Sequence, residues 1–295
     1  MKRMLCVALC LSACGDKERQ FDATGSFEAV EVTVSSEAAG RILSFDVTEG
    51  YGVTAGEPLG AIDSVQLYLS KLQLMQSVSS VRSNRPNVQT QIAALREQIA
   101  RQQTERARVR KLLDAGAATQ KQLDDMDAAI AVLERQMAAQ QSSLRNSVSS
   151  LDAQSTALEI QIAQIEDRLA KCVIASPLTG TVLAKYAEAG ELSVVGKPLF
   201  KVADLKHVFL RAYLTSAQLA GIRLGQEVQV VADFGGKQQR QYRGVVSRIS
   251  EKSEFTPKSI QTRNDRENLV YAVKIAVEND GYIKIGMYGE LRIEN

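Results

Sequence analysis

The chain contains 295 residues and carries a net charge of +2, from 36 lysine and arginine residues against 34 aspartate and glutamate residues. The two signs are well mixed, and no sustained basic face with interleaved aromatic residues occurs, so the sequence argues against nucleic-acid binding. The length allows two or three domains. The absence of tryptophan and an aromatic content of 5% suit a long helical hairpin better than one large globular core.

The N-terminus has the pattern of a processing signal. Lys2 and Arg3 precede a short apolar run over residues 4–11, which is too short to span a bilayer as a helix. Small residues then precede Cys14, an arrangement that resembles a bacterial lipobox. We therefore expect a lipoprotein signal peptide over residues 1–13. The alternative is an ordinary secretory signal with an incidental cysteine.

Cleavage before Cys14 would place this residue at the start of a linker over residues 14–26, with acyl chains on its sulfur and its amine. Two or more acyl chains hold a protein stably at a membrane, whereas one chain binds only marginally. Asp16, the second residue after the cysteine, resembles the residue that retains such lipoproteins at the inner membrane. The rest of the chain has no apolar stretch long enough for a transmembrane helix.

A pattern of 25 residues occurs twice in the chain, 140 positions apart. Gly40–Ser64 and Gly180–Asp204 align without a gap, and each contains a short apolar run, a glycine turn and a G-x-P-L motif. We therefore expect one small β domain built from two halves, residues 27–63 and residues 172–204. The identical positions are Gly40/Gly180, Leu43/Leu183, Gly50/Gly190, Gly56/Gly196, Pro58/Pro198 and Leu59/Leu199.

The segment between the two halves, residues 64–171, has a helical pattern. Its only proline is Pro86 and its only glycine is Gly116, which lies near the middle. Glycine is favoured just past a helix C-terminus, and Thr119, followed three residues later by a glutamine, has the spacing of a capping box that begins a helix. The pattern predicts two helices of nearly equal length, each about 75 Å long, that meet at a tip near residues 115–119.

Apolar residues recur in both predicted helices at alternating steps of three and four, which predicts an antiparallel coiled coil. Pro86 is expected to interrupt the first helix because it lacks an N–H and clashes with the preceding turn. In the second helix the heptads slip near Ser147, in a serine-rich stretch that we expect opposite Pro86. Both arms are therefore expected to weaken at one height, and we predict a bend or a break of the hairpin there. The seam residues are Val78, Val81, Val88, Ile92, Leu95, Ile99, Val109 and Leu113, then Leu123, Met126, Ile130, Leu133, Met137, Leu144, Val148, Leu151, Leu158, Ile162, Ile165 and Leu169.

The residues after 204 alternate between apolar and polar, which predicts a small antiparallel β-barrel over residues 205–295. His207 is the only histidine, and no cysteine cluster, nucleophilic triad or nucleotide-binding fingerprint occurs, so we expect no metal and no enzyme activity. Cys172 lies in an apolar strand pattern and would be a buried structural thiol. The expected strands are 208–214, 227–233, 242–249, 269–277 and 287–293, with a short helix at 215–224.

These patterns resemble the membrane fusion proteins, or periplasmic adaptors, of the HlyD-like type. Residues 39–53 and 174–182 look like the two halves of a split lipoyl, or biotinyl-like, domain, and the resemblance covers nearly the whole chain after the signal peptide. It implies an elongated α+β protein in which a coiled-coil α-hairpin interrupts a lipoyl-like domain and a β-barrel follows. True carriers hold a modifiable lysine between the halves, where this chain has Asp63, Ser64 and the helical insert. The resemblance therefore implies no lipoyl or biotin cofactor.

Three residues near the expected tip resemble the motif with which adaptors dock a TolC-like outer-membrane channel. Arg108, Leu112 and Thr119 have the motif's spacing, with threonine in place of serine. Arg108 offers a rigid fork of donors, Leu112 an apolar contact and Thr119 a hydroxyl. Arg108 could instead pair across the hairpin with Asp124 or Asp125. Leu112 could pack in the seam, and Thr119 could serve only as a helix cap.

The resemblance implies a periplasmic adaptor anchored by lipid to the inner membrane of a Gram-negative bacterium. Several copies, six by family resemblance, would form a ring between an inner-membrane transporter and the outer-membrane channel. The segment 255–268 resembles a loop of the branch that serves ABC-type exporters, and few residues flank the β domains for the extra domain usual with RND pumps. The alternatives are an RND adaptor and a structural coiled-coil lipoprotein of the envelope that transports nothing.

Overall fold

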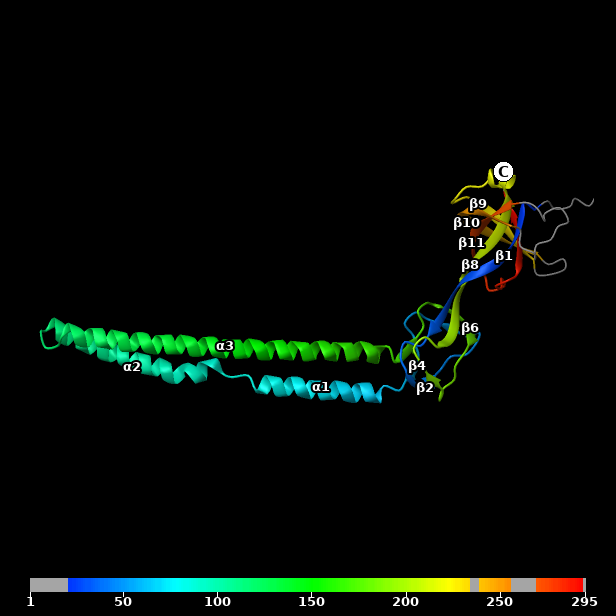
Figure 1. Ribbon diagram of the computed structural model, residues 1–295. Coiled ribbons are helices and arrows are strands. Elements are labelled where there is room, and N and C mark those ends of the chain that lie inside the picture. Colours follow the sequence, from blue (N-terminus) through cyan, green and yellow to red (C-terminus); the bar gives the residue numbers. More distant parts are fainter. Residues whose placement is uncertain (1–20, 234–238, 256–268, 294–295) are drawn as a thin grey trace, which may run out of the picture.

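The molecule is elongated, with a long helical hairpin that projects from two β modules (Figure 1). The expectation of a mixed α and β protein with such a hairpin is confirmed. The predicted signal peptide, Cys14, Asp16 and most of the segment 255–268 lie outside the described residues. Within the described part of the chain, no helix combines the length and the hydropathy that a membrane span requires. The computed structural model describes residues 21–233, 239–255 and 269–293.

The β module at the base of the hairpin, which we call the root module, consists of two small sheets. One sheet has the order β5-β4-β2-β7, and the other runs from β3 through β6 to β8 and β1. Each sheet contains strands from before and after the hairpin, since β4 pairs with β5 and β3 pairs with β6. The two halves thus interlock around a core that includes Ile42, Leu59 and Phe200. The strands are β1 (Ala23–Ser35), β2 (Gly40–Phe45), β3 (Gly52–Val53), β4 (Pro58–Ile62), β5 (Val173–Ala175), β6 (Gly180–Lys185), β7 (Leu192–Ser193) and β8 (Pro198–Thr215).

The internal repeat begins earlier than the sequence pattern indicates. Ser36 and Ser176, also 140 positions apart, are both buried. Each hydroxyl donates to the carbonyl two residues further on, at 2.7 and 2.6 Å. Their own carbonyls accept hydrogen bonds from the N–H groups of Gly196 and Gly56, both at 2.8 Å. The same hydrogen-bonded turn therefore leads into each half of the root module.

The second β module, which we call the terminal module, has six strands that pair in a closed antiparallel order. The order is β1-β12-β9-β10-β11-β8, and β8 pairs back with β1. Its core includes Phe27, Leu210 and Leu291. The helix α4 (Ser216–Leu219) is shorter than the predicted 215–224, because the chain turns after it and buries Ile222. The remaining strands are β9 (Glu227–Asp233), β10 (Gln239–Phe255), β11 (Leu269–Glu278) and β12 (Tyr288–Arg292).

The first strand corrects the predicted domain boundary. The sequence predicts a linker up to residue 26, but Ala23–Ser26 already pair with β12. β1 and β8 run side by side through both modules. The linker prediction is wrong for these residues because Ala23 and Phe27 fill the core of the terminal module.

A bulge in β8 marks the junction of the two modules. Ala29 pairs with Val208, but Val30 pairs with Asp204, so residues 205–207 have no partner on β1. Asp204 Oδ1 accepts hydrogen bonds from two of their N–H groups, at 2.9 and 3.2 Å. The bulge therefore has its own hydrogen-bonded support where the ladder between β1 and β8 is interrupted.

The hairpin has a first arm made of α1 (Val65–Ser83) and α2 (Val88–Asp114) and a second arm made of α3 (Gln120–Ala170). Both helices of the first arm lie antiparallel along α3 (Figure 1). The predicted coiled-coil seam supplies the buried side of both arms. Its buried members are Val78, Ile92, Ile99, Leu123, Ile130 and Leu144, and the polar residue Ser155 is buried on the same arm as the last three.

The first arm is interrupted at Pro86, as predicted, but the second arm is not. α2 begins after Asn87, whose side chain accepts a hydrogen bond from the N–H of Thr90 at 3.2 Å. α3 continues through the serine-rich stretch, so the weakening expected there does not interrupt the second arm. Serine hydroxyls there bond within the helix, as Ser147 Oγ does to the carbonyl of Ser143 at 3.1 Å. The backbone ladder accommodates such bonds without breaking.

The interruption also shifts the register of the two arms. Near the tip Arg106 forms a two-pronged ion pair with Asp127. Further down Arg85 pairs with Asp152 at 3.2 Å, one helical turn further along α3 than a constant register would place its partner. Non-helical residues rise about 3.3 Å each against 1.5 Å in a helix, so the link between α1 and α2 adds length to the first arm. The break therefore lies opposite Asp152 and not, as expected, opposite Ser147.

Replacing Phe27 by alanine tests whether β1 belongs to the terminal module. The side chain is buried, so Phe27→Ala should lower the free energy of unfolding by about 3–5 kcal/mol. Val30→Ala, on the same strand but 52% exposed, should cost less than about 1 kcal/mol. Urea denaturation followed by circular dichroism measures both, and amide exchange should localise the loss to β9–β12. Equally small effects of the two substitutions would contradict the packing.

Candidate functional site at the hairpin tip

The tip of the hairpin begins with a glycine that ends α2. Gly116 has a φ of 75°, in the left-handed region that glycine adopts without strain. Its N–H donates to the carbonyl of Leu113 at 2.9 Å, and the N–H of Ala117 donates to that of Leu112 at 2.7 Å. This pair of bonds is a Schellman motif, which satisfies the last carbonyls of a helix. The predicted tip near residues 115–119 is thus built by local backbone chemistry.

Thr119 begins the second arm with the predicted capping box. Its hydroxyl accepts a hydrogen bond from the N–H of Gln122 at 3.3 Å, and its own N–H donates to Gln122 Oε1 at 2.8 Å. The capping role is therefore confirmed. Because the hydroxyl acts as an acceptor in the cap, its O–H remains able to donate to a partner outside the chain.

Arg108 stays on its own helix and does not cross to the second arm. Its Nη1 donates to Glu105 Oε2 at 3.0 Å, and the side chain is 71% exposed. The alternative pairing with Asp124 or Asp125 does not form, and Asp124 instead accepts from Gln120 at 2.7 Å. An exposed pair of this kind contributes little stability. Arg108 can therefore exchange Glu105 for another acceptor at small cost.

Near the tip, Arg106 crosses between the arms. Its hydrogen bonds to Asp127 raise the pKa of Arg106 and lower the pKa of Asp127. Sequence reasoning missed this pair, although Arg106 interrupts the apolar seam and so faces the other arm. The two arginines therefore have different roles. Arg106 forms an ion pair between the arms, while Arg108, two residues further on, is exposed away from the seam.

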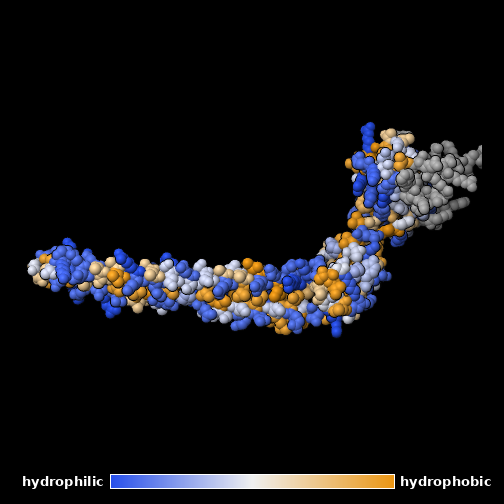
Figure 2. All heavy atoms as spheres, in the orientation of Figure 1, coloured by the Kyte–Doolittle hydropathy of each residue, from blue (hydrophilic) through white to orange (hydrophobic). Residues whose placement is uncertain are grey.

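Leu112 is the apolar member of the tip. Its side chain is 50% exposed, whereas the neighbouring Leu113 is the more buried of the two. The alternative that Leu112 packs in the seam is therefore not what the structure has. Arg108 and Leu112 lie one helical turn apart and share a face of α2. Figure 2 shows a largely hydrophilic surface at this end of the hairpin.

The other residues singled out in the sequence have structural roles. Asp63 Oδ1 accepts a hydrogen bond from the N–H of Val65 at 3.1 Å, where α1 leaves the root module. Cys172 is buried, and burial raises the pKa of its thiol. His207 Nδ1 lies 2.8 Å from Asp204 Oδ2 in the bulge. No group of three or more metal-ligating side chains occurs within the described part of the chain.

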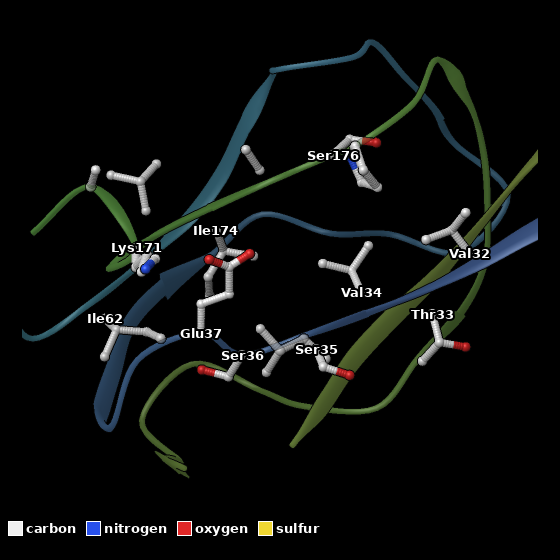
Figure 3. A pocket seen from close by; sticks show the side chains of 15 residues that line it. Val32, Thr33, Val34, Ser35, Ser36, Glu37, Ile62, Lys171, Ile174 and Ser176 are labelled. Carbon is white, nitrogen blue, oxygen red and sulfur yellow. The ribbon is translucent and has the colours of Figure 1, made fainter. Parts of the chain in front are cut away.

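A cavity in the root module was not predicted from the sequence. It has a volume of about 550 Å³ and lies between β1 and β5, each of which lines it. Figure 3 shows that Val32, Val34 and Ile62 line it, together with Glu37 and Lys171. The cavity forms where the edges of the two sheets face each other, a feature that depends on the assembled module and has no local sequence signal.

Curated proteins described as UPF0194 membrane proteins are similar to the chain over most of its length. That of Yersinia pseudotuberculosis serotype O:3 (strain YPIII) is 27% identical over 291 residues, covering 89% of this chain and 86% of the relative. That of Citrobacter koseri is 25% identical over 303 residues, covering 89% of this chain and 85% of the relative. No known protein-family model matches the chain.

Solved structures share the arrangement of hairpin and β modules. MacA from Actinobacillus actinomycetemcomitans has a TM-score of 0.53 at 21% identity, covering 91% of this chain and 76% of that one. The membrane fusion protein Spr0693 from Streptococcus pneumoniae R6 has a TM-score of 0.55 at 16% identity, covering 92% and 97%. The chain therefore has the fold of the membrane fusion proteins, as its sequence resemblance predicts.

Proposed function

We propose that this protein is a periplasmic adaptor of a tripartite efflux or secretion system. It links an inner-membrane transporter to a TolC-like outer-membrane channel and has no catalytic activity or cofactor of its own. The observation that carries the proposal is the hairpin, which separates an exposed tip from the β modules. Its second arm is one helix of 51 residues, about 75 Å long. A rigid arm of that length suits a protein that bridges two partners.

The tip is the proposed contact with the channel. Arg108 is exposed and held only by a weak pair, so it can donate its fork of N–H groups to carboxylates or carbonyls of a partner. Leu112 offers an apolar contact on the same face of α2. Thr119 offers an O–H at the start of α3. The three residues lie on either side of one tight turn and could act on the same partner.

The lipid anchor would orient the molecule. Acylation of Cys14 puts the membrane at most about 30 Å from Ala23, the first residue of β1, at the reach of an extended chain. The terminal module, where β1 begins, would therefore lie near the inner membrane, with the hairpin tip at the far end. Asp16 would keep the lipoprotein in that membrane.

The transporter is proposed to be of the ABC type, because the segment 255–268 resembles a loop of that branch. Six copies forming a ring, as the resemblance implies, would surround the path between transporter and channel. An RND partner is the main alternative. A structural envelope lipoprotein would use the same lipid anchor and coiled coil but would have no need of the tip residues.

Reversing the charge at Arg108 tests the docking role of the tip. Arg108→Asp should lower export at least tenfold, because a like charge placed against an acidic partner costs several kcal/mol. The matched control is Arg110→Asp on the same helix, where Arg110 pairs with Asp114 at 3.5 Å, and it should leave export unchanged. Export is measured as resistance to a panel of toxic compounds, and docking as cross-linking to the outer-membrane channel. Equal export from both variants at equal protein levels would remove the tip from the mechanism.

Removing the acylated cysteine tests the anchor. Cys14→Ser should abolish lipid modification, and the protein should move from the membrane fraction to the soluble periplasmic fraction, since no helix in the described residues can span the membrane. Intact mass of the purified protein reports the acyl chains directly. Cys172→Ala, at the buried thiol, should stay in the membrane fraction. An unmodified wild-type mass would show that the N-terminus is an ordinary secretory signal.

A further inference from the structure

One helix of the hairpin has apolar side chains on two opposite sides. The inner side of α1, which includes Leu74 and Val78, is turned to α3. The outer side carries five large apolar side chains that are 43–56% exposed. Figure 2 shows an orange band along the part of the hairpin nearer its root. The α1 outer face consists of Val65, Tyr68, Leu69, Leu72 and Met75, which recur at helical spacing.

The α1 outer face carries no charge. Lys71 is the only charged residue between Val65 and Val81, and its Nζ lies 2.7 Å from Glu166 of α3, toward the inner side. A surface helix ordinarily places charged residues opposite its buried side, whereas a helix that is apolar all round is buried all round. Within the part of the chain that the structure describes, α3 covers one side of α1 only.

The α1 outer face is large enough to form the centre of an interface between two proteins. Five large side chains, each about half exposed, leave about 500 Å² of apolar surface if a full side chain counts about 200 Å². The largest apolar patch of an ordinary monomer is about 300–600 Å² and is often functional. Each partner of a stable complex contributes about 800 Å². The face therefore supplies more than half of one side of such an interface.

The opposite edge of the hairpin has small side chains at the same height. The ion pairs of Lys71 with Glu166 and of Arg82 with Glu159, both at 2.7 Å, place this part of α3 beside α1. Four exposed residues recur at helical spacing on the side of α3 away from its seam, and three of them are alanines. The α3 small-residue face consists of Ala153, Ala157, Ile160 and Ala163.

We propose that the α1 outer face packs on the α3 small-residue face of a second copy of this chain. When two hairpins lie side by side, the bulky side chains on α1 of one copy meet the alanines on α3 of the other. The two helices can therefore lie close together. A contact between two different faces leaves one α1 face and one α3 face free at the two ends of any open assembly, so the contact repeats until a ring closes. The inference rests on the proposed adaptor, whose ring it deepens by naming the contact between copies.

Cysteine cross-linking of the full-length protein in its membrane tests the contact. Met75→Cys combined with Ala163→Cys places thiols on the two faces at similar heights, and the background is low because Cys172 is buried. Mild oxidation should convert more than half of the protein into a ladder of covalent multimers on a non-reducing gel. Either substitution alone should give monomer. Met75→Cys with Ala138→Cys, about 37 Å nearer the tip on α3, should also give monomer.

Two results would overturn the proposal. Efficient dimers from Met75→Cys alone would mean that the α1 outer face meets its own copy about a two-fold axis. No cross-link from the Met75 and Ala163 pair, with both thiols reactive to maleimide, would mean that another partner covers the face. Leu69→Asp with Leu72→Asp should weaken self-association at least tenfold in analytical ultracentrifugation. Val132→Asp, at an equally exposed valine nearer the tip, should not.

Different results would contradict the contact between copies and the docking of the tip to the channel. Arg108→Asp should leave the ladder from Met75→Cys and Ala163→Cys intact, because the tip lies far along the hairpin from this contact. A ladder with no effect of Arg108→Asp on export would sink the docking role and leave the contact standing. Loss of export in Arg108→Asp, together with no ladder from the Met75→Cys and Ala163→Cys pair, would contradict the contact between copies and leave the docking role standing.

Discussion

The hairpin depends on the strand pairing that closes the root module. β4 leads into α1 and α3 leads into β5, and these two strands are hydrogen-bonded to each other. The N–H of Ile62 also donates to the carbonyl of Cys172 at 2.8 Å. The two feet of the hairpin are therefore held at strand spacing, about 4.8 Å, which keeps the arms within packing reach. Because each sheet takes strands from both halves, neither half can form its core alone.

Along the arms, burial keeps the helices together, and ion pairs between the arms show their register. The pairs of Arg82 with Glu159 and Arg106 with Asp127 have largely exposed side chains, and exposed pairs contribute little to stability. They do show which residues lie opposite each other. The buried seam lies on both sides of the break in the first arm, so the interruption at Pro86 removes local helix bonds and leaves the contact between the arms in place.

The parts of the fold that act through near neighbours could be predicted from the sequence. Gly116 and Thr119 predicted the tip because a glycine that ends a helix and a threonine that caps one act through hydrogen bonds to nearby residues. Both form these hydrogen bonds in the structure. Residues 23–26 are small and carry no strand signal of their own. They form a strand because they pair with β12, far along the chain. At the hairpin tip, the family resemblance pointed to Arg108, Leu112 and Thr119 as candidate site residues. Only the structure shows how exposed their side chains are. The seam position of Arg106 turns it toward the other arm, but its partner Asp127 depends on the register of the two arms, which no local pattern records.

The two strands that pass through both modules have a mechanical consequence. β1 and β8 form one antiparallel pair from the terminal module into the root module, and the hydrogen bonds of such a pair lie across the strand direction. A pull along β1 from its N-terminal end therefore loads these bonds together in shear and does not unzip them one after another. Residues 205–207 of β8 have no partner on β1, but Asn279 donates hydrogen bonds to the carbonyls of Leu205 and Lys206. Tension applied to β1 would thus pass along β1 directly, and at the bulge β8 would be held by the other side of its sheet.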